Sequence, residues 1–239
     1  WKIFLENQLD SGHPSITHAS TGLAAQKVEK EMEAETGRTP PLSYHYISAF
    51  AMELEKWGAL DVVGHPNGHC VLQGYMGLRP NDPDTLEYEE VMRKKYGPDR
   101  TEEILDVNIH HLLVYPCLSI QSPLQQLRAV RPLAPNKTLT EIWHFRLKGA
   151  PEAIYRRSLD YFYLVNSPST MINADDLYNF WKCQVGLESD GGDWVSFHRN
   201  AGQDLVDDGV ATSVIGFSEL PMRNQFEAWR AYMTAEERT

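Results

Sequence analysis

Residues 110–148 decide the fold, and they read HHLLVYPCLSIQSPLQQLRAVRPLAPNKTLTEIWHFRLK. Leucine, valine and tyrosine crowd residues 110–121, while residues 124–131 and 138–148 alternate between apolar and polar side chains. Alternation with a period of two is typical of half-buried β-strands. The sequence therefore predicts three strands, the last two joined as a hairpin through a turn at Asn136-Lys137.

Helical patterns lie on both sides of this strand region. Before it we predict a helix over 16–32 that ends near Gly37, two short strands over 62–78 around a Pro66-Asn67-Gly68 turn, and a polar helical excursion over 80–106. Residues 1–10 fit a helix or an extended lead-in, and residues 43–57 fit either a helix or a strand. After it we predict helices over 151–165, 175–186 and 221–237. The fold class is therefore α+β, an antiparallel sheet with helices on one side.

Composition narrows the possible functions. The 239 residues suffice for one domain, spanning residues 1–239, and 42% of them are hydrophobic. The net charge of −11 argues against binding to nucleic acid, which requires a basic face. No apolar run approaches the ~18 residues of a membrane span. The three cysteines are scattered, which favours a reducing compartment and a cytoplasmic location.

Two histidines and an acidic pair form a candidate metal site. Asp10, His13 and His18 lie close together in sequence, and Asp175-Asp176 follow far downstream. Two imidazoles and one carboxylate can cover one face of a non-haem Fe(II) ion and leave positions open for oxygen and substrate. On a regular helix, a spacing of five residues would turn His13 and His18 about 140° apart. Both reach one metal only if the helix is interrupted, and Pro14 offers that interruption, with His13 near the N-cap.

Simpler interpretations exist for each of these residues. The histidines could be unrelated, one capping a helix and one at the surface. Asp10 could orient His13 or could belong to a turn. Asp175-Asp176 could simply favour the positive end of a helix capped by Asn173. His69 and the pair His110-His111 are more typical of core or pocket histidines than of ligands.

Motifs spread over nearly the whole chain resemble one known family. They are Trp1-Lys2, Glu6-Asn7, Asp10-x-x-His13-x4-His18, Asn67-Gly68-His69, Tyr115-Pro116-Cys117-Leu118, Asp175-Asp176, Cys183-Gln184-x-Gly186-Leu187, Ser218-Glu219, Met222-Arg223, Trp229 and Tyr232-Met233. In this order they resemble the catalytic domain of the large (α) subunit of Rieske-type aromatic ring-hydroxylating oxygenases. The details are most similar to the branch that acts on benzoate-like and anthranilate-like acids.

The resemblance implies a fold and a set of site residues. It implies a helix-grip (Bet v 1-like) fold, a curved antiparallel sheet packed around a long C-terminal helix. Mononuclear Fe(II) would be held by His13, His18 and Asp176. Asp10 would match the carboxylate that links this iron to the Rieske cluster of a neighbouring subunit. Asn7 would match an active-site asparagine, although it lies one residue closer to Asp10 than in the family pattern.

The resemblance also implies cofactors and partners. A Rieske [2Fe-2S] domain is expected upstream of residue 1, because these 239 residues contain no Cys-x-His ligand pair. Electrons would come from NADH through a reductase or ferredoxin, and O2 would hydroxylate or cis-dihydroxylate an aromatic substrate. An α-subunit trimer, with or without a small β subunit, is expected.

The substrate pocket can be outlined only in part. We expect it to include His111, Leu118, Ile172 and Phe180. A carboxylated ring would require a basic residue in the pocket, and the strands offer the candidates Arg128, Arg131 and Arg146, each of which could instead face solvent.

Two other functions fit the same residues. A helix-grip cavity could serve a non-catalytic protein that binds hydrophobic ligands, since fold alone does not fix function. Two histidines and one aspartate also suit the zinc of a hydrolase with an open coordination position.

Overall fold

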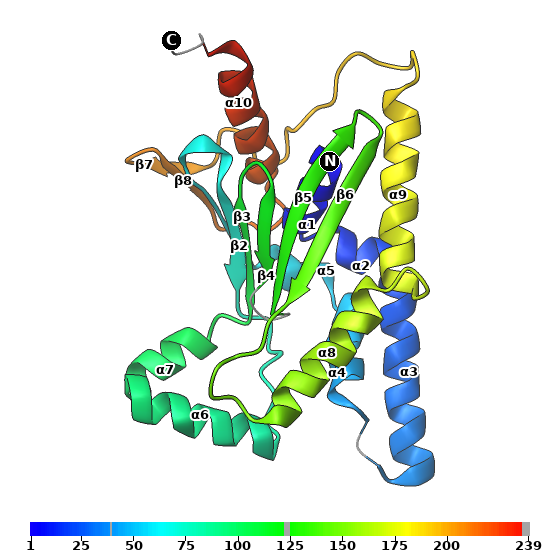
Figure 1. Cartoon of the computed structure of the whole chain (residues 1–239), viewed down its shortest axis with the longest axis vertical. Helices are drawn as coiled ribbons and strands as arrows, with labels where there is room; N and C mark the ends of the chain where they lie inside the picture. The colour runs from blue at the N-terminus through cyan, green and yellow to red at the C-terminus, as the bar shows by residue number, and fades with distance from the viewer. Residues whose placement is uncertain (39, 122–124, 236–239) are drawn as a thin grey trace.

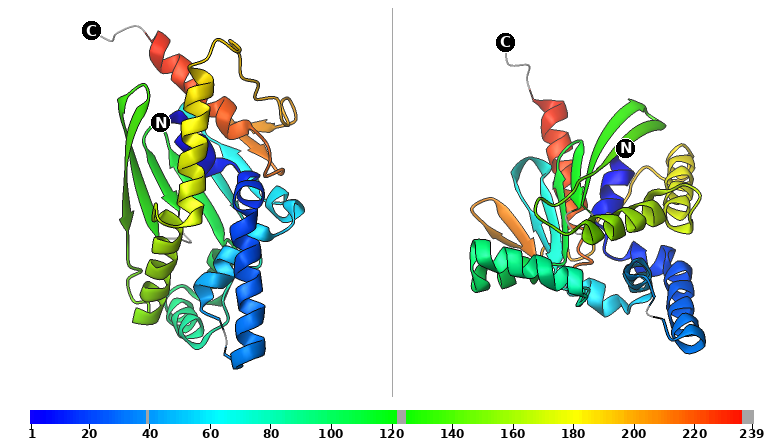
Figure 2. Two further views of the ribbon diagram at one scale, coloured as in Figure 1. Left: turned by 90° about the vertical axis from the view of Figure 1, so that its right-hand side faces the viewer. Right: turned by 60° about the horizontal axis from the view of Figure 1, so that its bottom comes forward.

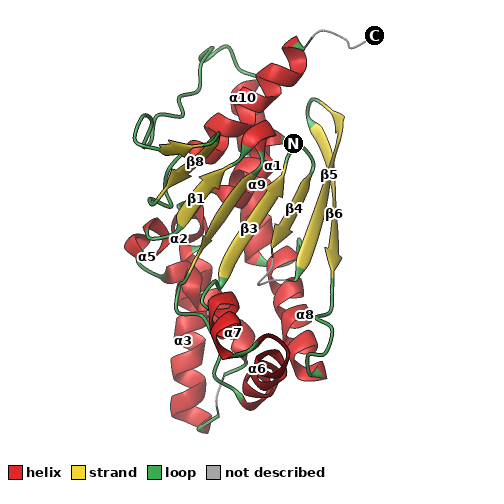
Figure 3. Ribbon diagram, turned by 90° about the vertical axis from the view of Figure 1, so that its left-hand side faces the viewer, coloured by secondary structure: helices red, strands yellow, loops and turns green. Residues whose placement is uncertain are grey.

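A computed structural model of the protein describes residues 1–38, 40–121 and 125–235. Its centre is one sheet in which every neighbouring pair of strands is antiparallel (Figures 1 and 3). The order across the sheet is β6-β5-β4-β3-β2-β1-β8-β7. The strands are β1 (Asp61–Gly64), β2 (Cys70–Gly74), β3 (Ile109–Val114), β4 (Leu118–Gln121), β5 (Gln126–Ala134), β6 (Lys137–His144), β7 (Leu205–Asp207) and β8 (Val210–Ser213).

Helices cover one face of this sheet. Figure 3 shows α1, α9 and α10 behind the strands, and Figure 2 shows α1 between the sheet and α9. The α-helices are α1 (Lys2–Leu9), α2 (His13–Thr17), α3 (Ala19–Thr36), α4 (Leu42–Ser48), α5 (Leu54–Gly58), α6 (Pro83–Tyr96), α7 (Pro98–Leu105), α8 (Glu152–Asn166), α9 (Met171–Leu187) and α10 (Leu220–Thr234). Short 3-10 turns occupy Ala49–Ala51 and Pro66–Gly68.

The sheet and the C-terminal helix give the expected helix-grip-like α+β architecture. Helix α10 packs on β1 and on the turn between β1 and β2. That turn places Asn67 and Gly68 at positive φ, and a Cβ on Gly68 would lie 2.8 Å from the Tyr115 ring and 2.9 Å from Ala228. Only glycine permits α10 to approach this closely.

The predicted strands are present, with corrections to two of them. The strand expected over 110–121 is two strands, because the chain turns at 115–117, where a proline nitrogen cannot donate to the ladder. The hairpin around Asn136 is confirmed as β5 and β6, although the strand ends at His144 rather than at 148. The two strands around Pro66-Asn67-Gly68 are confirmed. The expected first residue of β5, Leu124, lies outside the described residues.

The helix predictions need corrections at their ends. Helix α9 begins at Met171 with Thr170 as N-cap, so Asn173 is not the cap; its side chain donates to the Asn166 carbonyl at 2.9 Å. The excursion over 80–106 is the pair α6 and α7, separated by Gly97 at φ 82°. Residues 43–57 are helical, and residues 1–10 contain α1. The end of the last predicted helix, residues 236–237, lies outside the described residues, and the short strands β7 and β8 were not predicted.

Two apolar clusters lie beneath the helices. The larger one joins α1, α5, the inner face of the sheet and α10 through side chains that include Leu5, Leu9, Trp57, Val62, Leu72, Leu113 and Val130. The smaller one joins α3, α4, α8 and α9 through Ala25, Ile47, Tyr161 and Ile172. Across residues 1–38, 40–121 and 125–235, no helix has the length and apolar character needed to cross a bilayer. Phe50 packs against both clusters, and its ring centroid lies 5.4 Å from that of His18.

Candidate metal centre and cavity

Breaks in the N-terminal helices position the two histidines. Helix α1 stops before Asp10, which is extended at φ −91° and ψ 108°. Helix α2 then begins at His13, with Pro14 in its first turn, where a missing N–H costs nothing. His18 ends α2 and precedes α3. His13 is therefore the first residue of α2, and Gly12 is the N-cap. The helical path is broken at His18, between α2 and α3, and this break allows the two rings to approach each other.

Three side chains from distant parts of the chain converge here. Single donor atoms of His13, His18 and Asp176 all lie within 4.8 Å of one another. The Asp176 Oδ1 atom is 3.2 Å from His18 Nε2 and 4.0 Å from His13 Nε2. The imidazole rings are 5.5 Å apart at an interplanar angle of 78°, so their edges can face a common point. Asp176 comes from α9, on the far side of α1 from the sheet (Figure 2).

Neighbouring groups orient both imidazoles. The His13 Nδ1–H donates to the Asp10 carbonyl at 2.8 Å, which leaves the Nε2 lone pair facing Asp176. Burial lowers the pKa of His13, against the raising effect of Asp176 and Asp10, which favours the neutral ring that a metal needs. His18 is 1% exposed, and its Nδ1 lies 3.5 Å from an Asp175 oxygen without a well-formed hydrogen bond.

Asp10 and Asn7 both lie at the site, and Asp10 contacts His13 through its backbone rather than through its side chain. Asp10 contacts His13 through its backbone carbonyl, while its carboxylate accepts from the Gly12 N–H at 3.2 Å and lies 3.8 Å from Arg199. Asn7 Nδ2 donates to Asp176 Oδ1 at 3.2 Å. The asparagine thus restrains the carboxylate on the opposite element.

These residues fit a divalent iron ion. Two neutral imidazoles and one carboxylate are the donors that Fe(II) sites use, and each group is oriented by a neighbour as metal ligands usually are. The buried His18 ring, which faces carboxylates at both nitrogens, is otherwise poorly satisfied. The donor set alone does not distinguish Fe(II) from zinc.

A cavity of about 410 Å³ adjoins the three ligand candidates, all of which line it. Of the predicted pocket residues, His111 and Ile172 line it as well. The volume is within the range of small-molecule sites. Apolar side chains predominate in the walls, including Phe50, Leu72, Ile109, Ile154 and Val165.

Two predicted pocket residues do not line this cavity. Leu118 alternates along β4 with Ser119 and Gln121, which are buried on the inner face, so Leu118 points to the outer face of the sheet. Phe180 packs edge-on against Phe4 at 5.9 Å and lines a smaller hollow beside Asp10 and His13. The structure therefore places Leu118 on the outer face of the sheet and Phe180 at the smaller hollow.

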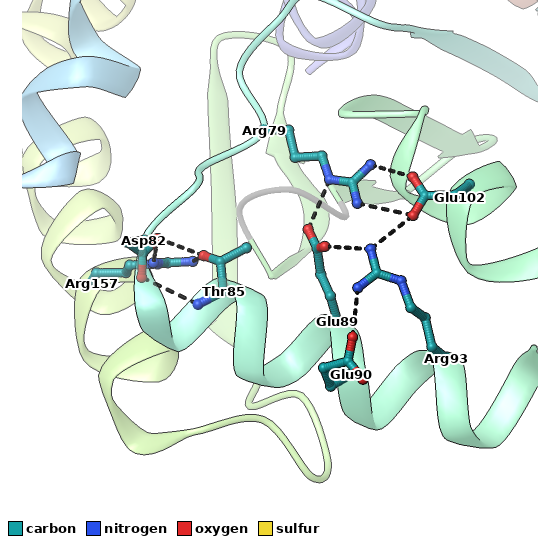
Figure 4. A network of polar contacts seen from close by, with 8 residues as sticks. All are labelled: Arg79, Asp82, Thr85, Glu89, Glu90, Arg93, Glu102 and Arg157. Atoms are coloured by element: carbon teal, nitrogen blue, oxygen red, sulfur yellow. Dashed lines mark hydrogen bonds and ion pairs between the residues drawn. The ribbon is translucent and has the colours of Figure 1, made fainter. Parts of the chain in front are cut away.

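Helices α6 and α7 close the cavity opposite the ligands. Arg79, Thr85, Glu89 and Arg157 line the cavity and belong to a polar network that joins the two helices to each other and to α8 (Figure 4). Glu89, which is 3% exposed, accepts from Arg79 at 2.8 Å and from Arg93 at 2.9 Å. A second part of the network joins α6 to α8: Arg157 donates to the Asp82 carboxylate and to the Thr85 hydroxyl, each at 2.7 Å. This network fixes the excursion as a wall of the cavity.

His111 gives the protein a predicted sensitivity to acid. Burial, and secondarily Arg128, lowers the pKa of His111 to about 4, and its Nδ1–H donates to the Gln8 carbonyl at 3.2 Å. An unfolded chain would protonate this ring near pH 6.5, so between pH 6.5 and 4 the unfolded state binds more protons and stability falls as pH falls.

We therefore expect the metal-free protein to lose about 1–2 kcal/mol more stability than His111→Gln between pH 7 and pH 4.5. The upper value of this range is a maximum, because the His111 ring lines the cavity and is not fully enclosed by protein. Urea unfolding at the two pH values measures the difference. Parallel losses in the two proteins would show that His111 is protonated equally in the folded and unfolded chains.

Several cavity residues were not predicted. They are Gln8, Gln121, Gln125 and Tyr161, together with Asp175 as the neighbour of His18. Only Gln121 lies on a strand, so alternation along the sequence could have indicated this residue but not the others. His69, by contrast, has a structural role: its Nδ1 accepts a hydrogen bond from the Tyr115 N–H at 3.0 Å.

Comparison with known proteins gives relatives of one kind. The chain is 28% identical over 204 residues to the anthranilate 1,2-dioxygenase large subunit of Acinetobacter baylyi, covering 83% of this chain and 41% of that protein. It is 22% identical over 205 residues to the 2-halobenzoate 1,2-dioxygenase large subunit of Burkholderia cepacia, covering 84% and 41%. The chain thus spans less than half the length of these relatives.

Solved structures support the fold. A naphthalene 1,2-dioxygenase variant bound to phenanthrene matches with a TM-score of 0.69 at 21% identity, covering 98% of this chain and 52% of that one. Naphthalene 1,2-dioxygenase from Rhodococcus sp., bound to indole, matches with a TM-score of 0.66 at 19% identity, covering 99% and 54%. The family profile described as ring hydroxylating alpha subunit (catalytic domain) matches residues 1–235. The chain therefore belongs to the family of ring-hydroxylating dioxygenase alpha subunits, and it is their catalytic domain.

Proposed function

We propose that this domain uses mononuclear Fe(II), held by His13, His18 and Asp176, to hydroxylate or cis-dihydroxylate an aromatic ring with O2. The observation that carries the proposal is the convergence of these three donors on the wall of a mainly apolar cavity. Iron(II) bound there supplies the one-electron chemistry that O2 activation requires. Family membership disfavours the non-catalytic binder and the zinc hydrolase, neither of which is a dioxygenase.

The residues of the chain have distinct tasks in this proposal. The Asp10 carbonyl orients His13, the Asp175 carboxylate faces the outer nitrogen of His18, and Asn7 restrains Asp176. The apolar walls hold the ring and exclude water, which limits side reactions of activated oxygen. In this proposal the Asp10 carboxylate, which lies beside a second hollow, is the bridge through which electrons enter from a neighbouring subunit.

Partners complete the proposed enzyme. Electrons come from NADH through a reductase or ferredoxin and a Rieske [2Fe-2S] cluster, and the α subunits form a trimer, with or without a small β subunit. Large apolar side chains on α9 support burial in an assembly: Leu177, Tyr178 and Trp181 are 48%, 55% and 56% exposed. We place the enzyme in the cytoplasm. The names of the two relatives favour a ring that bears a carboxylate as substrate.

The test uses the whole oxygenase with its Rieske domain and an NADH-dependent reductase. Under ¹⁸O2, we expect label from O2 in the hydroxylated product of an aromatic acid, formed only after Fe(II) is supplied. Product labelled from water, or turnover with zinc and without O2, would favour hydrolysis instead. Absence of any product with tight binding of apolar ligands would favour the binding protein.

A further inference from the structure

Arg128 is a buried cation in the proposed active-site cavity. It lies on β5, where Gln126, Arg128 and Val130 face the covered side of the sheet. The side chain is 6% exposed and lines the same cavity as the ligand candidates. The other two candidate arginines face outward: Arg131 and Arg146 are 62% and 52% exposed and pair with Glu141 and Glu152.

Among the residues that the structure describes, no carboxylate forms an ion pair with Arg128. Within residues 1–38, 40–121 and 125–235, no carboxylate oxygen lies within 4.0 Å of its guanidinium nitrogens, whereas the half-buried Arg79 and Arg157 each have a carboxylate at 2.7 Å. A buried charge without a counter-ion is costly, and proteins rarely retain one without a use.

Neutral amides hold the guanidinium instead. The Gln126 Oε1 atom accepts from Nε at 3.1 Å and from Nη2 at 2.8 Å, and Asn166 Oδ1 accepts from Nη2 at 3.2 Å. Gln8 Oε1 accepts from Nη1. Because a guanidinium has five N–H donors, this set fixes the plane of the group and leaves an Nη1 hydrogen for a further acceptor.

The charge persists at neutral pH. Burial lowers the pKa of Arg128 to about 10, with Asp176 acting in the opposite direction. Arg128 therefore remains protonated while His111 beside it is neutral. Three carboxylates line the cavity: Asp10, Glu89 and Asp176. Glu89 pairs with Arg79, Asp10 lies beside Arg199, and Asp176 would be used by a bound metal, so none of them is available to balance the charge of Arg128.

We propose that Arg128 binds the carboxylate of an aromatic acid and holds its ring between the sheet and the metal site. This rests on the proposed function and assigns the residue that selects the substrate. The anion accepts the remaining Nη1 hydrogen and supplies the missing counter-charge, while the ring packs among Ile172, Val165 and Phe50. An acid is thereby favoured over a neutral ring of the same shape.

The experiment compares matched probes on the whole oxygenase, loaded with Fe(II) and kept free of O2. Calorimetric titration with benzoate and benzamide, and with 2-aminobenzoate and 2-aminobenzamide, isolates the charge. We expect each acid to bind about 10- to 100-fold more tightly than its amide, the range for a hydrogen bond to a charged partner. We expect Arg128→Met to reduce this ratio to within about threefold of unity, through loss of affinity for the acid.

The control is Arg131→Met, which changes the outer face of the same strand and should leave the ratio unchanged. Arg128→Met removes the arginine donor from the side-chain oxygens of Gln126 and Asn166 and one of the two donors to Gln8, so its fold is checked by circular dichroism. Arg128→Lys, which keeps the charge, should retain part of the preference. The wild-type ratio tests the proposal without any variant. Acid and amide bound equally by the wild type, or a preference that survives in folded Arg128→Met, would overturn it.

Failure of this proposal differs from failure of the proposed function. If Arg128 is not the anchor, the enzyme still hydroxylates rings with O2 but shows no loss of preference in the variant. If the enzyme is not an oxygenase, no ring is hydroxylated, whatever the binding ratio.

Discussion

Asp176→Ala is expected to abolish stable iron binding and with it ring hydroxylation, whereas Asp175→Ala should retain both in reduced measure. Removing even a group that orients a metal ligand costs about 10- to 100-fold in affinity or activity, so loss of a ligand should exceed about 100-fold. Asp175 contacts only the outer nitrogen of His18, at 3.5 Å, and its loss should cost about tenfold. The adjacent pair is thus its own matched control.

The measurement is iron per chain after anaerobic loading and desalting of the whole oxygenase, with product formation assayed beside it. Full iron in Asp176→Ala would remove this residue from the ligand set. An equal collapse in Asp175→Ala would show that both carboxylates bind the metal.

Glu89→Ala is expected to destabilise the protein by about 2–4 kcal/mol. Removing one partner from a buried ion pair costs about 3–5 kcal/mol, because the remaining charge is left uncompensated. Here the cost is reduced because Arg79 and Arg93 also contact Glu102, at 2.7 and 2.9 Å, and are 22% and 31% exposed. The loss of stability should nevertheless be large, because Glu89 is buried and accepts hydrogen bonds from both arginines (Figure 4).

Glu90→Ala provides the comparison. Glu90 is the next residue on α6, is 61% exposed and pairs with the same Arg93 at 3.0 Å. Its loss should cost less than about 1 kcal/mol, as for other exposed pairs. Urea unfolding of both variants measures the contrast, and equal midpoints for the two would mean that the buried position of Glu89 adds no stability.

The sequence predicted the elements better than their faces. Alternation in β5 and β6 is strong enough to identify the hairpin, because period-two patterning marks strands directly. The break between β3 and β4 was visible only as Pro116. Strands β7 and β8 are too short to show a periodicity, and β7 is exposed along its whole length. Leu118 and Phe180 show why pocket residues are harder still: one residue of register, or the rotation of one helix, decides whether a side chain faces the cavity.

The ligand candidates were predictable for a different reason. Pro14 indicated that the spacing between His13 and His18 need not be helical, and the resemblance selected Asp176 over Asp175. The neighbours that support them were not predictable: the Asp10 group that orients His13 is a backbone carbonyl, which no side-chain pattern encodes. Likewise, Arg128 could be distinguished from Arg131 and Arg146 only once the sheet had a covered face.

Helix α9 is a long helix that buries only Ile172 fully within the chain. Much of its attachment lies at one end, where Asn7 reaches Asp176 across 169 residues of sequence and Asp175 and Asp176 meet His18. A metal bound at that point would link segments that lie far apart in the sequence. Part of the free energy of metal binding would then stabilise the docking of α9. If a metal binds there, the metal-free protein should expose α9 to proteases more readily than the metal-loaded protein does.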